Sequence, residues 1–111
     1  MTQNIFANKL SIGNRWLGHN YTFELTVAKH VGSLGIGGDI RKRQDGLGHE
    51  VIIDFIKPDE WGANNGVKMD DEIVAFNGKD VIAMTEKEIR KTLNGTRPLT
   101  IKFFREGILS S

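Results

Sequence analysis

Few side chains in this sequence could take part in chemistry. His19, His30 and His49 are far apart along the chain, and the chain contains no cysteine. Zinc binding and a general-base role are therefore not indicated. Ser33 has flanking glycines at the wrong spacing for the Gly-x-Ser-x-Gly nucleophile elbow, and the acidic run 70–72 does not match an EF-hand loop. The sequence predicts a protein that is not an enzyme and that has no metal and no cofactor.

A glycine-rich segment, Val-Gly-Ser-Leu-Gly-Ile-Gly-Gly at 31–38, is the other feature of chemical interest. It is not a phosphate-binding P-loop, because no Gly-Lys-Ser/Thr follows, and it lacks the third glycine of a dinucleotide fingerprint. Taken by itself, the segment indicates a tight turn that uses the conformational freedom of glycine.

Length and composition indicate one small domain. The chain has 111 residues, 39% of them hydrophobic, and a net charge of +1, which suits one modest core and gives no general attraction to nucleic acid or membrane. No apolar run approaches the roughly 20 residues that span a bilayer, and residues 1–10 lack the apolar segment of a signal peptide. Since cysteine is also absent, we expect an intracellular, cytoplasmic protein, with association with a membrane through its partners left open. We also expect a monomer.

Strand patterns are clear from residue 21 onward. Residues 21–27 alternate strictly, which is typical of a half-buried strand. Its apolar face consists of Tyr21, Phe23, Leu25 and Val27. After the glycine-rich turn comes the segment 39–43, and 44–48 has the composition of a turn. Residues 51–56 are rich in β-branched side chains, which predicts a strand that is buried on most of both faces and ends before Pro58.

The second half of the chain contains further strands and one good helix. A short irregular or helical piece over 59–66 precedes the strand 72–76, which Asn77-Gly78 closes as a two-residue hairpin turn. Asn94-Gly95 is predicted to end the helix in a left-handed conformation. The alternating run 99–103 predicts a final strand.

The helix is predicted over 86–93. Thr85 stands three residues before Glu88, which is the arrangement of a capping box. Ile89 and Leu93 fall on one face at i, i+4 spacing, so that face is expected to lie on the core.

This order of elements predicts the α+β class. We expect a small, partly open antiparallel β-barrel or sandwich of five to six strands, capped by two helices. Residues 21–106 form the predicted domain. Residues 1–20 are expected to be an extension, mobile or docked, and 107–111 a C-terminal tail.

Three stretches in this order resemble the PDZ family, with the strand order of adaptor-type members. Lys29-His-Val-Gly-Ser-Leu-Gly-Ile36 is similar to its carboxylate-binding loop. The stretch 61–78, Trp-Gly-Ala-Asn-Asn-Gly-Val-Lys-Met-Asp-Asp-Glu-Ile-Val-Ala-Phe-Asn-Gly, resembles its small helix, turn and following strand. The helix and closing strand complete the match. Ser33 replaces the first glycine of the loop tetrapeptide, and Asp70 replaces the glycine of a Gly-Asp pair.

The resemblance implies a protein-protein interaction module. The C-terminal tail of a partner protein would add as a strand in a groove between strand 36–41 and helix 86–93. Its carboxylate would be bound by consecutive backbone amides in a nest, reinforced by a lysine through a water. The implied carboxylate-binding residues are Leu34, Gly35, Ile36 and Lys29.

The same resemblance assigns the rest of the groove. The pocket for the last ligand side chain is expected to consist of Leu34, Ile36, Leu93 and Arg90, although Arg90 could instead only pair with Glu86. The specificity positions are Glu86, Asp54, Asp39 and Gly37. Glu86 stands where many members have a histidine, and it can only accept hydrogen bonds. The expected ligand therefore has an apolar last residue and a basic or hydroxylated residue upstream.

Three alternatives remain open. The domain could be a substrate-recognition or regulatory part of a larger enzyme. The basic run 41–43 could bind phosphoinositide headgroups at a membrane surface. The extension 1–20 could block the groove, in which case the domain would serve as a structural or dimerisation unit.

Overall fold

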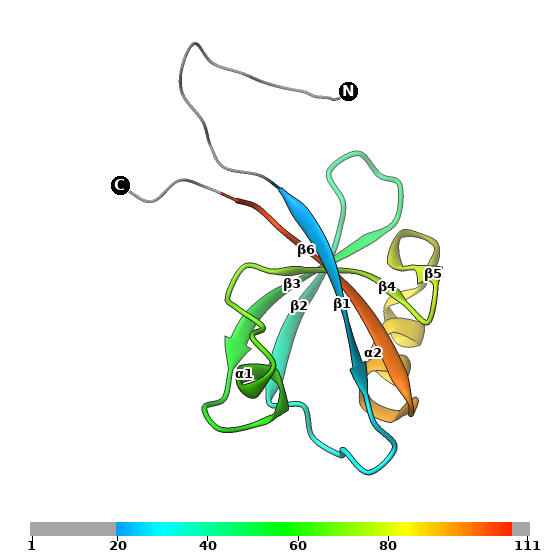
Figure 1. Cartoon of the computed structure of the whole chain (residues 1–111). Coiled ribbons are helices and arrows are strands. Elements are labelled where there is room, and N and C mark those ends of the chain that lie inside the picture. Colours follow the sequence, from blue (N-terminus) through cyan, green and yellow to red (C-terminus); the bar gives the residue numbers. More distant parts are fainter. Residues whose placement is uncertain (1–19, 108–111) are drawn as a thin grey trace, which may run out of the picture.

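The structure is a computed structural model and describes residues 20–107. The predictions for 1–19 and 108–111, which include docking or blocking by the extension, lie outside the described residues. The described part contains six strands, two α-helices and one 3₁₀ turn (Figure 1). In chain order they are β1 (Tyr21–Val27), β2 (Ile36–Lys42), β3 (His49–Ile56), α1 (Trp61–Asn64), β4 (Glu72–Phe76), β5 (Lys79–Asp80), η1 (Val81–Ala83), α2 (Glu86–Gly95) and β6 (Leu99–Arg105).

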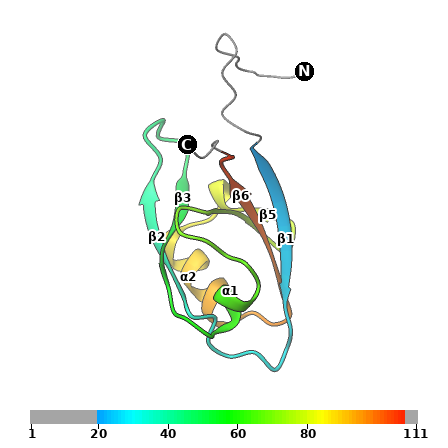
Figure 2. The same cartoon turned by 60° about the vertical axis from the view of Figure 1, so that its left-hand side comes forward.

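All strand pairs are antiparallel and form one sheet in the order β1-β6-β4-β3-β2, with β5 paired to β4. The strands β1 and β2 are the two ends of this order. Figure 2 shows them on opposite sides of the fold, with α1 and α2 between them. The predicted fold class, a partly open antiparallel sheet with two helices, is confirmed.

The alternating pattern of β1 is confirmed except at Tyr21, which is 46% exposed at the start of the strand. Phe23 and Leu25 are half buried and Val27 is fully buried, whereas Thr22 and Glu24 are exposed. The ring of Phe23 stacks on Phe103 of β6, with 5.2 Å between centroids. Burying these apolar side chains on one face is worth about 25 cal/mol per Å².

The expectation that β3 is buried on most of both faces is wrong. Val51 and Ile53 are fully buried, but Asp54 is exposed and Phe55 is 55% exposed. The reason is a register shift between β2 and β3. Gly38 pairs with Ile53 and Gly37 pairs with Phe55, so Asp54 is an extra residue in β3. Such a bulge turns the next side chain, that of Phe55, away from the face of Val51 and Ile53.

The predicted capping box of α2 is present. The Thr85 hydroxyl accepts from the Glu88 amide (3.1 Å), and the Glu88 carboxylate accepts from the Thr85 amide (2.9 Å). Ile89 and Leu93 lie in the core, as predicted. The predicted left-handed stop at 94–95 is wrong, because the helix continues through Gly95 and the chain leaves it at Thr96 with an extended backbone.

The hairpin turn predicted at Asn77-Gly78 is confirmed. Both residues have positive φ, 48° and 83°, and Phe76 pairs with Lys79 across the turn. Positive φ at both central residues is what a two-residue type I′ turn requires.

The core lies between the sheet and the two helices. Among its fully buried side chains are Val27, Val51, Ile53, Ile73, Ile89, Leu99, Ile101 and Phe103. Within the described range, no helix is long and apolar enough to cross a membrane.

Candidate functional site

The strand β2 has an open edge beside α2. Within residues 20–107 it pairs only with β3. Ile36 lies opposite Ile56, and the adjacent Lys57 amide donates to the Gly35 carbonyl at 2.7 Å. Because hydrogen-bonded and non-hydrogen-bonded pairs alternate in antiparallel ladders, the N–H and C=O of Ile36 point away from β3. They face the open edge.

The loop that enters β2 is held through its carbonyl groups. The Leu34 carbonyl accepts from the Gly62 amide of α1 at 2.9 Å, and the Gly35 carbonyl accepts from Lys57. In the part of the chain that the structure describes, the amides of Leu34 and Gly35 donate no hydrogen bond to a backbone or side-chain acceptor. Buried amides rarely stay unpaired, so these two groups are available to a ligand.

Gly35 and its neighbours are fixed by Glu60, the residue before α1. Gly35 has φ 65°, in the left-handed region that favours glycine. The Ser33 hydroxyl donates to Glu60 Oε1 at 3.2 Å, and the Lys57 ammonium lies 3.2 Å from Glu60 Oε2. Ser33, which replaces a glycine of the family's loop, therefore takes part in holding the loop in place.

A cavity of about 440 Å³ opens between this loop and the C-terminal end of α2. It is lined by Gly32, Ser33, Leu34, Gly35, Ile36, Phe55, Lys57, Leu93, Asn94 and Arg97. The structure thus brings together Leu34, Gly35, Ile36 and Leu93 of the predicted site.

Four lining residues were missed by sequence reasoning: Phe55, Lys57, Asn94 and Arg97. Lys29, the predicted cation, lies in the exposed turn after β1 and does not line the cavity. Its proposed action through a water stays a prediction. No local pattern signals Arg97, since the loop carbonyl that it contacts, Gly32, is 65 residues away in the chain.

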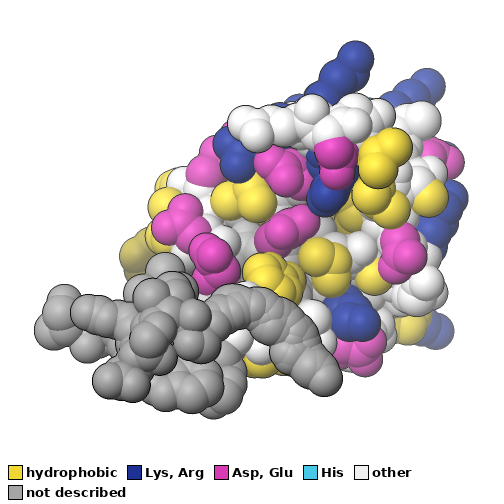
Figure 3. Space-filling view, turned by 90° about the horizontal axis from the view of Figure 1, so that it is seen from above, with side chains coloured by type: hydrophobic (Ala, Val, Ile, Leu, Met, Phe, Trp, Pro, Cys, Tyr) yellow, Lys and Arg dark blue, Asp and Glu magenta, His cyan; other side chains and the backbone are white. Residues whose placement is uncertain are grey.

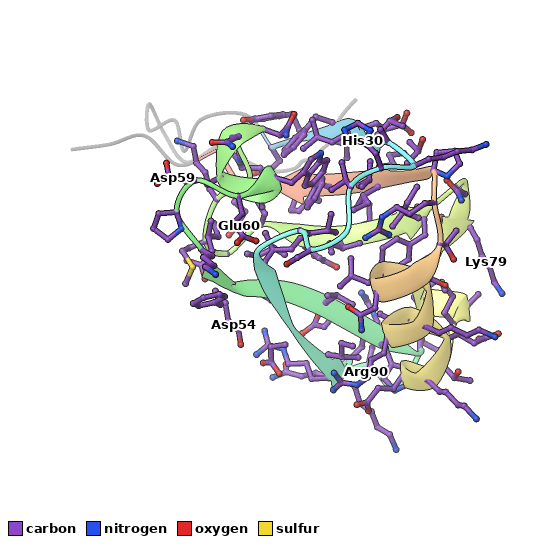
Figure 4. The ribbon with its side chains drawn as sticks, turned by 90° about the horizontal axis from the view of Figure 1, so that it is seen from below. His30, Asp54, Asp59, Glu60, Lys79 and Arg90 are labelled. Carbon is purple, nitrogen blue, oxygen red and sulfur yellow. The ribbon has the colours of Figure 1, made fainter. Side chains whose placement is uncertain are left out.

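Glu86 and Arg90 pair with each other along one side of α2. Arg90 donates to Glu86 Oε2 from Nη2 (2.8 Å) and from Nε (3.1 Å). Both side chains are about half exposed, and Arg90 does not line the cavity. In Figure 4 Arg90 lies between the ribbons of α2 and β2. The negative charge of Glu86 is therefore partly neutralised by Arg90 within the domain itself.

The remaining specificity positions lie on and beside β2. Asp39 is exposed and lies 3.6 Å from Arg41. Asp54 is exposed on β3, and a Cβ built on Gly37 would be 3.3 Å from its Oδ1 and 3.1 Å from the Cβ of Phe55. Asp39, Asp54 and Gly37 do not line the cavity. Their role as specificity positions stays a prediction.

The basic run 41–43 is largely neutralised. Arg41 binds Glu50 at 2.8 Å, and Arg43 binds Asp45 at 2.8 Å. Hydrogen bonding to Asp45 raises the pKa of Arg43, and the same contact lowers the pKa of Asp45.

In Figure 3 acidic, basic and hydrophobic side chains are mixed over the face seen from above. No cluster of three His, Cys, Asp or Glu side chains suited to a metal ion occurs among residues 20–107.

Comparison with known proteins matches residues 24–103 to the PDZ domain. Because this match covers most of the chain, the protein belongs to the PDZ domain family. The domain is a protein- and peptide-binding one, and no catalytic family matches.

A similar solved structure is INAD PDZ3, described in complex with a TRP channel tail. The TM-score is 0.59 at 19% sequence identity, and the match covers 75% of this chain and 84% of the other. At this identity the likeness shows the fold alone. No curated protein matches this chain.

Proposed function

We propose that this domain binds the C-terminal tail of a partner protein by adding it as a strand to the open edge of β2. The main support is the conjunction of three features at one place. These features are the outward N–H and C=O of Ile36, the cavity beside Leu93, and the amides of Leu34 and Gly35, which have no hydrogen-bond acceptor among residues 20–107. INAD PDZ3, which shares the fold, is described in complex with a TRP channel tail, and PDZ domains in general bind extended peptides by strand addition to a sheet edge.

The terminal carboxylate would accept hydrogen bonds from the amides of Leu34, Gly35 and Ile36. Charge-assisted bonds of this kind are roughly twice as strong as neutral ones. The last ligand side chain would enter the cavity against Leu34, Ile36 and Leu93. Burying a Val, Leu or Ile there is worth about 1.5–3 kcal/mol. After the costs of ordering the peptide, we expect affinities of about 1 μM or weaker.

The upstream preference follows from Glu86. Glu86 is the first residue of α2, and its carboxylate accepts hydrogen bonds only. A ligand with a hydroxyl or a basic group two residues before its terminus would supply the donor. Asp39 and Asp54 add negative charge near the path of the ligand. The proposed partner is therefore a protein whose tail ends in an apolar residue with a basic or hydroxylated residue upstream.

An amide-shift titration with a pool of C-terminal peptides tests this function. We expect the largest changes at the amides of Leu34, Gly35 and Ile36, and smaller ones along β2. The same peptides with amidated C-termini are the control, and they should cause much weaker changes. Uniform small shifts, or equal shifts with free and amidated peptides, would contradict the proposed mode.

A further inference from the structure

Arg97, in the turn between α2 and β6, is held by four backbone carbonyl groups. Its Nε donates to Val31 (2.9 Å) and its Nη2 to Gly32 (2.8 Å), both in the loop before β2. Its Nη1 donates to Leu93 (3.3 Å) and Thr96 (2.7 Å), at the end of α2. The guanidinium therefore joins the two walls of the cavity, which are far apart in sequence.

The charge of Arg97 has no carboxylate partner in the described structure. None of the ion pairs found among residues 20–107 involves it. A guanidinium has five N–H donors, and four carbonyl contacts leave one of those on Nη2 free. Arg97 also lines the cavity. A positive charge with a spare donor thus lies beside the loop amides.

The C-terminal end of α2 explains why a positive charge at Arg97 matters for binding an anion. Leu93 and Asn94 line the cavity, so the C-terminal end of the helix, with its partial negative charge, faces the place proposed for an anion. By itself this helix end would repel a carboxylate. Arg97 donates to two carbonyls at this end, those of Leu93 and Thr96, and so places a full positive charge beside their partial negative charges. The planar fork of arginine suits this role, whereas lysine has a single ammonium.

We infer that Arg97 is the cation that recognises the ligand's terminal carboxylate and that it also positions the loop 31–36. The inference rests on the proposed function and deepens it. It assigns to the turn after α2 a role that the sequence resemblance gives to Lys29, which is exposed and does not line the cavity. The ligand class that it predicts is a peptide with a free α-carboxylate rather than an internal segment or an amidated end.

The test compares two forms of one peptide, the tightest binder selected from a library of C-terminal peptides. It is made with a free carboxylate and with an amide, and each form is titrated into wild type, Arg97→Gln and Arg97→Lys. We expect wild type to prefer the free carboxylate. In Arg97→Gln the ratio of the affinities for the free and the amidated peptide should fall about tenfold, which corresponds to about 1.4 kcal/mol. Arg97→Lys should keep part of the preference, and added salt should weaken the preference least in Arg97→Gln.

Lys91→Gln on α2 is the matched control, because it removes an exposed positive charge that does not line the cavity. It should keep the wild-type preference. If Arg97→Gln weakens both forms of the peptide equally, Arg97 only supports the fold and the inference is overturned. The same holds if Lys91→Gln abolishes the preference. If Arg97→Gln does not fold, Arg97→Lys decides: an undiminished preference together with undiminished affinity overturns the positioning role.

Failure of the inference can be told apart from failure of the proposed function. If wild type does not distinguish the two forms of the peptide, carboxylate recognition itself fails. If wild type distinguishes them and Arg97→Gln does so equally well, only the role of Arg97 fails.

Discussion

Gly35 lies directly against Glu60, so closely that a Cβ built on Gly35 would come within 2.5 Å of the Glu60 Cβ. The backbone of Gly35 also has φ 65°, which side chains disfavour. The loop before β2 is thus in close contact with Glu60, the residue before α1. Its amides are oriented by this contact as well as by the hydrogen bonds of the Leu34 and Gly35 carbonyls.

Gly35→Ala should therefore damage both stability and binding. The left-handed backbone and the overlap with Glu60 are expected to cost about 2–3 kcal/mol together. Displacement of the loop should weaken peptide binding further than the stability loss explains. Urea unfolding and peptide titration measure the two effects. Gly32→Ala is the control in the same loop, because a Cβ added there would meet nothing within 4 Å; an equal loss in both variants would contradict the prediction.

Phe55 should contact the penultimate residue of the ligand. Side chains alternate between the two faces of a strand, so the ligand side chain before the last one points to the face of Gly37. Gly37 supplies no side chain there, and Phe55 of β3 is 55% exposed, with its Cβ 3.1 Å from a Cβ built on Gly37.

We expect peptides with an apolar penultimate residue to bind wild type several-fold better than those with alanine there, through roughly 1 kcal/mol of burial. Phe55→Ala should remove this difference. Replacements of the ligand residue two before the terminus serve as the control, since the side chain at that position points to the opposite face of the ligand strand. A difference that survives in Phe55→Ala would place the contact elsewhere.

Arg90 should weaken the interaction of Glu86 with basic ligands. The two hydrogen bonds between them, 2.8 and 3.1 Å, already occupy Glu86 Oε2. Arg90→Ala should therefore strengthen binding of peptides with lysine two residues before the terminus, by about two- to fivefold, given that exposed pairs are worth up to about 1 kcal/mol. Glu86→Lys should reverse the preference. Unchanged selection at that ligand position in both variants would remove Glu86 from the specificity site.

The parts of this fold that depend on close neighbours in the chain could be predicted from the sequence. The Thr85–Glu88 capping box and the Asn77-Gly78 turn each involve residues within four positions. Asp70, which stands where the resemblance places a family glycine, has φ 71°, in the left-handed region that favours glycine. Aspartate tolerates the left-handed region better than most residues, so the substitution left the turn intact.

Contacts between distant segments could not be predicted in this way. Arg97 is an ordinary basic residue in the sequence, and only the closure of the sheet brings it to Val31 and Gly32. Phe55 belongs to an apolar run, yet its exposure depends on the register shift between β2 and β3, which leaves Asp54 as an extra residue before it. Patterns report which residues are apolar, whereas the sheet order decides which of them a ligand can reach.

The buried ion pair of Asp71 and Arg105 should be important for stability. Arg105 donates to both carboxylate oxygens at 2.7 Å, and Asp71 is 1% exposed. Hydrogen bonding to Asp71 raises the pKa of Arg105. Asp71→Asn leaves a partly buried guanidinium without its partner, at an expected cost of about 2–4 kcal/mol in urea unfolding. Asp45→Asn, at the exposed pair with Arg43, is the matched control and should cost much less; equal losses would contradict the role of burial.

Glu72 should give the stability a pH dependence of opposite sign to that of an ion-paired carboxylate. Burial, and then repulsion from Glu50, raise the pKa of Glu72 above its ordinary value of 4.5. The folded state therefore binds this proton more tightly than the unfolded state, and the ionised form is unfavourable at neutral pH. Glu72→Gln should raise the urea midpoint at about pH 7, and the gain should shrink as the pH falls toward about 4, where the wild-type carboxyl group is increasingly protonated. Glu24→Gln, on the exposed face of β1, is the control. A Glu72→Gln variant that is less stable than wild type at neutral pH would show that attraction to Arg43 and Arg41 outweighs the effect of burial.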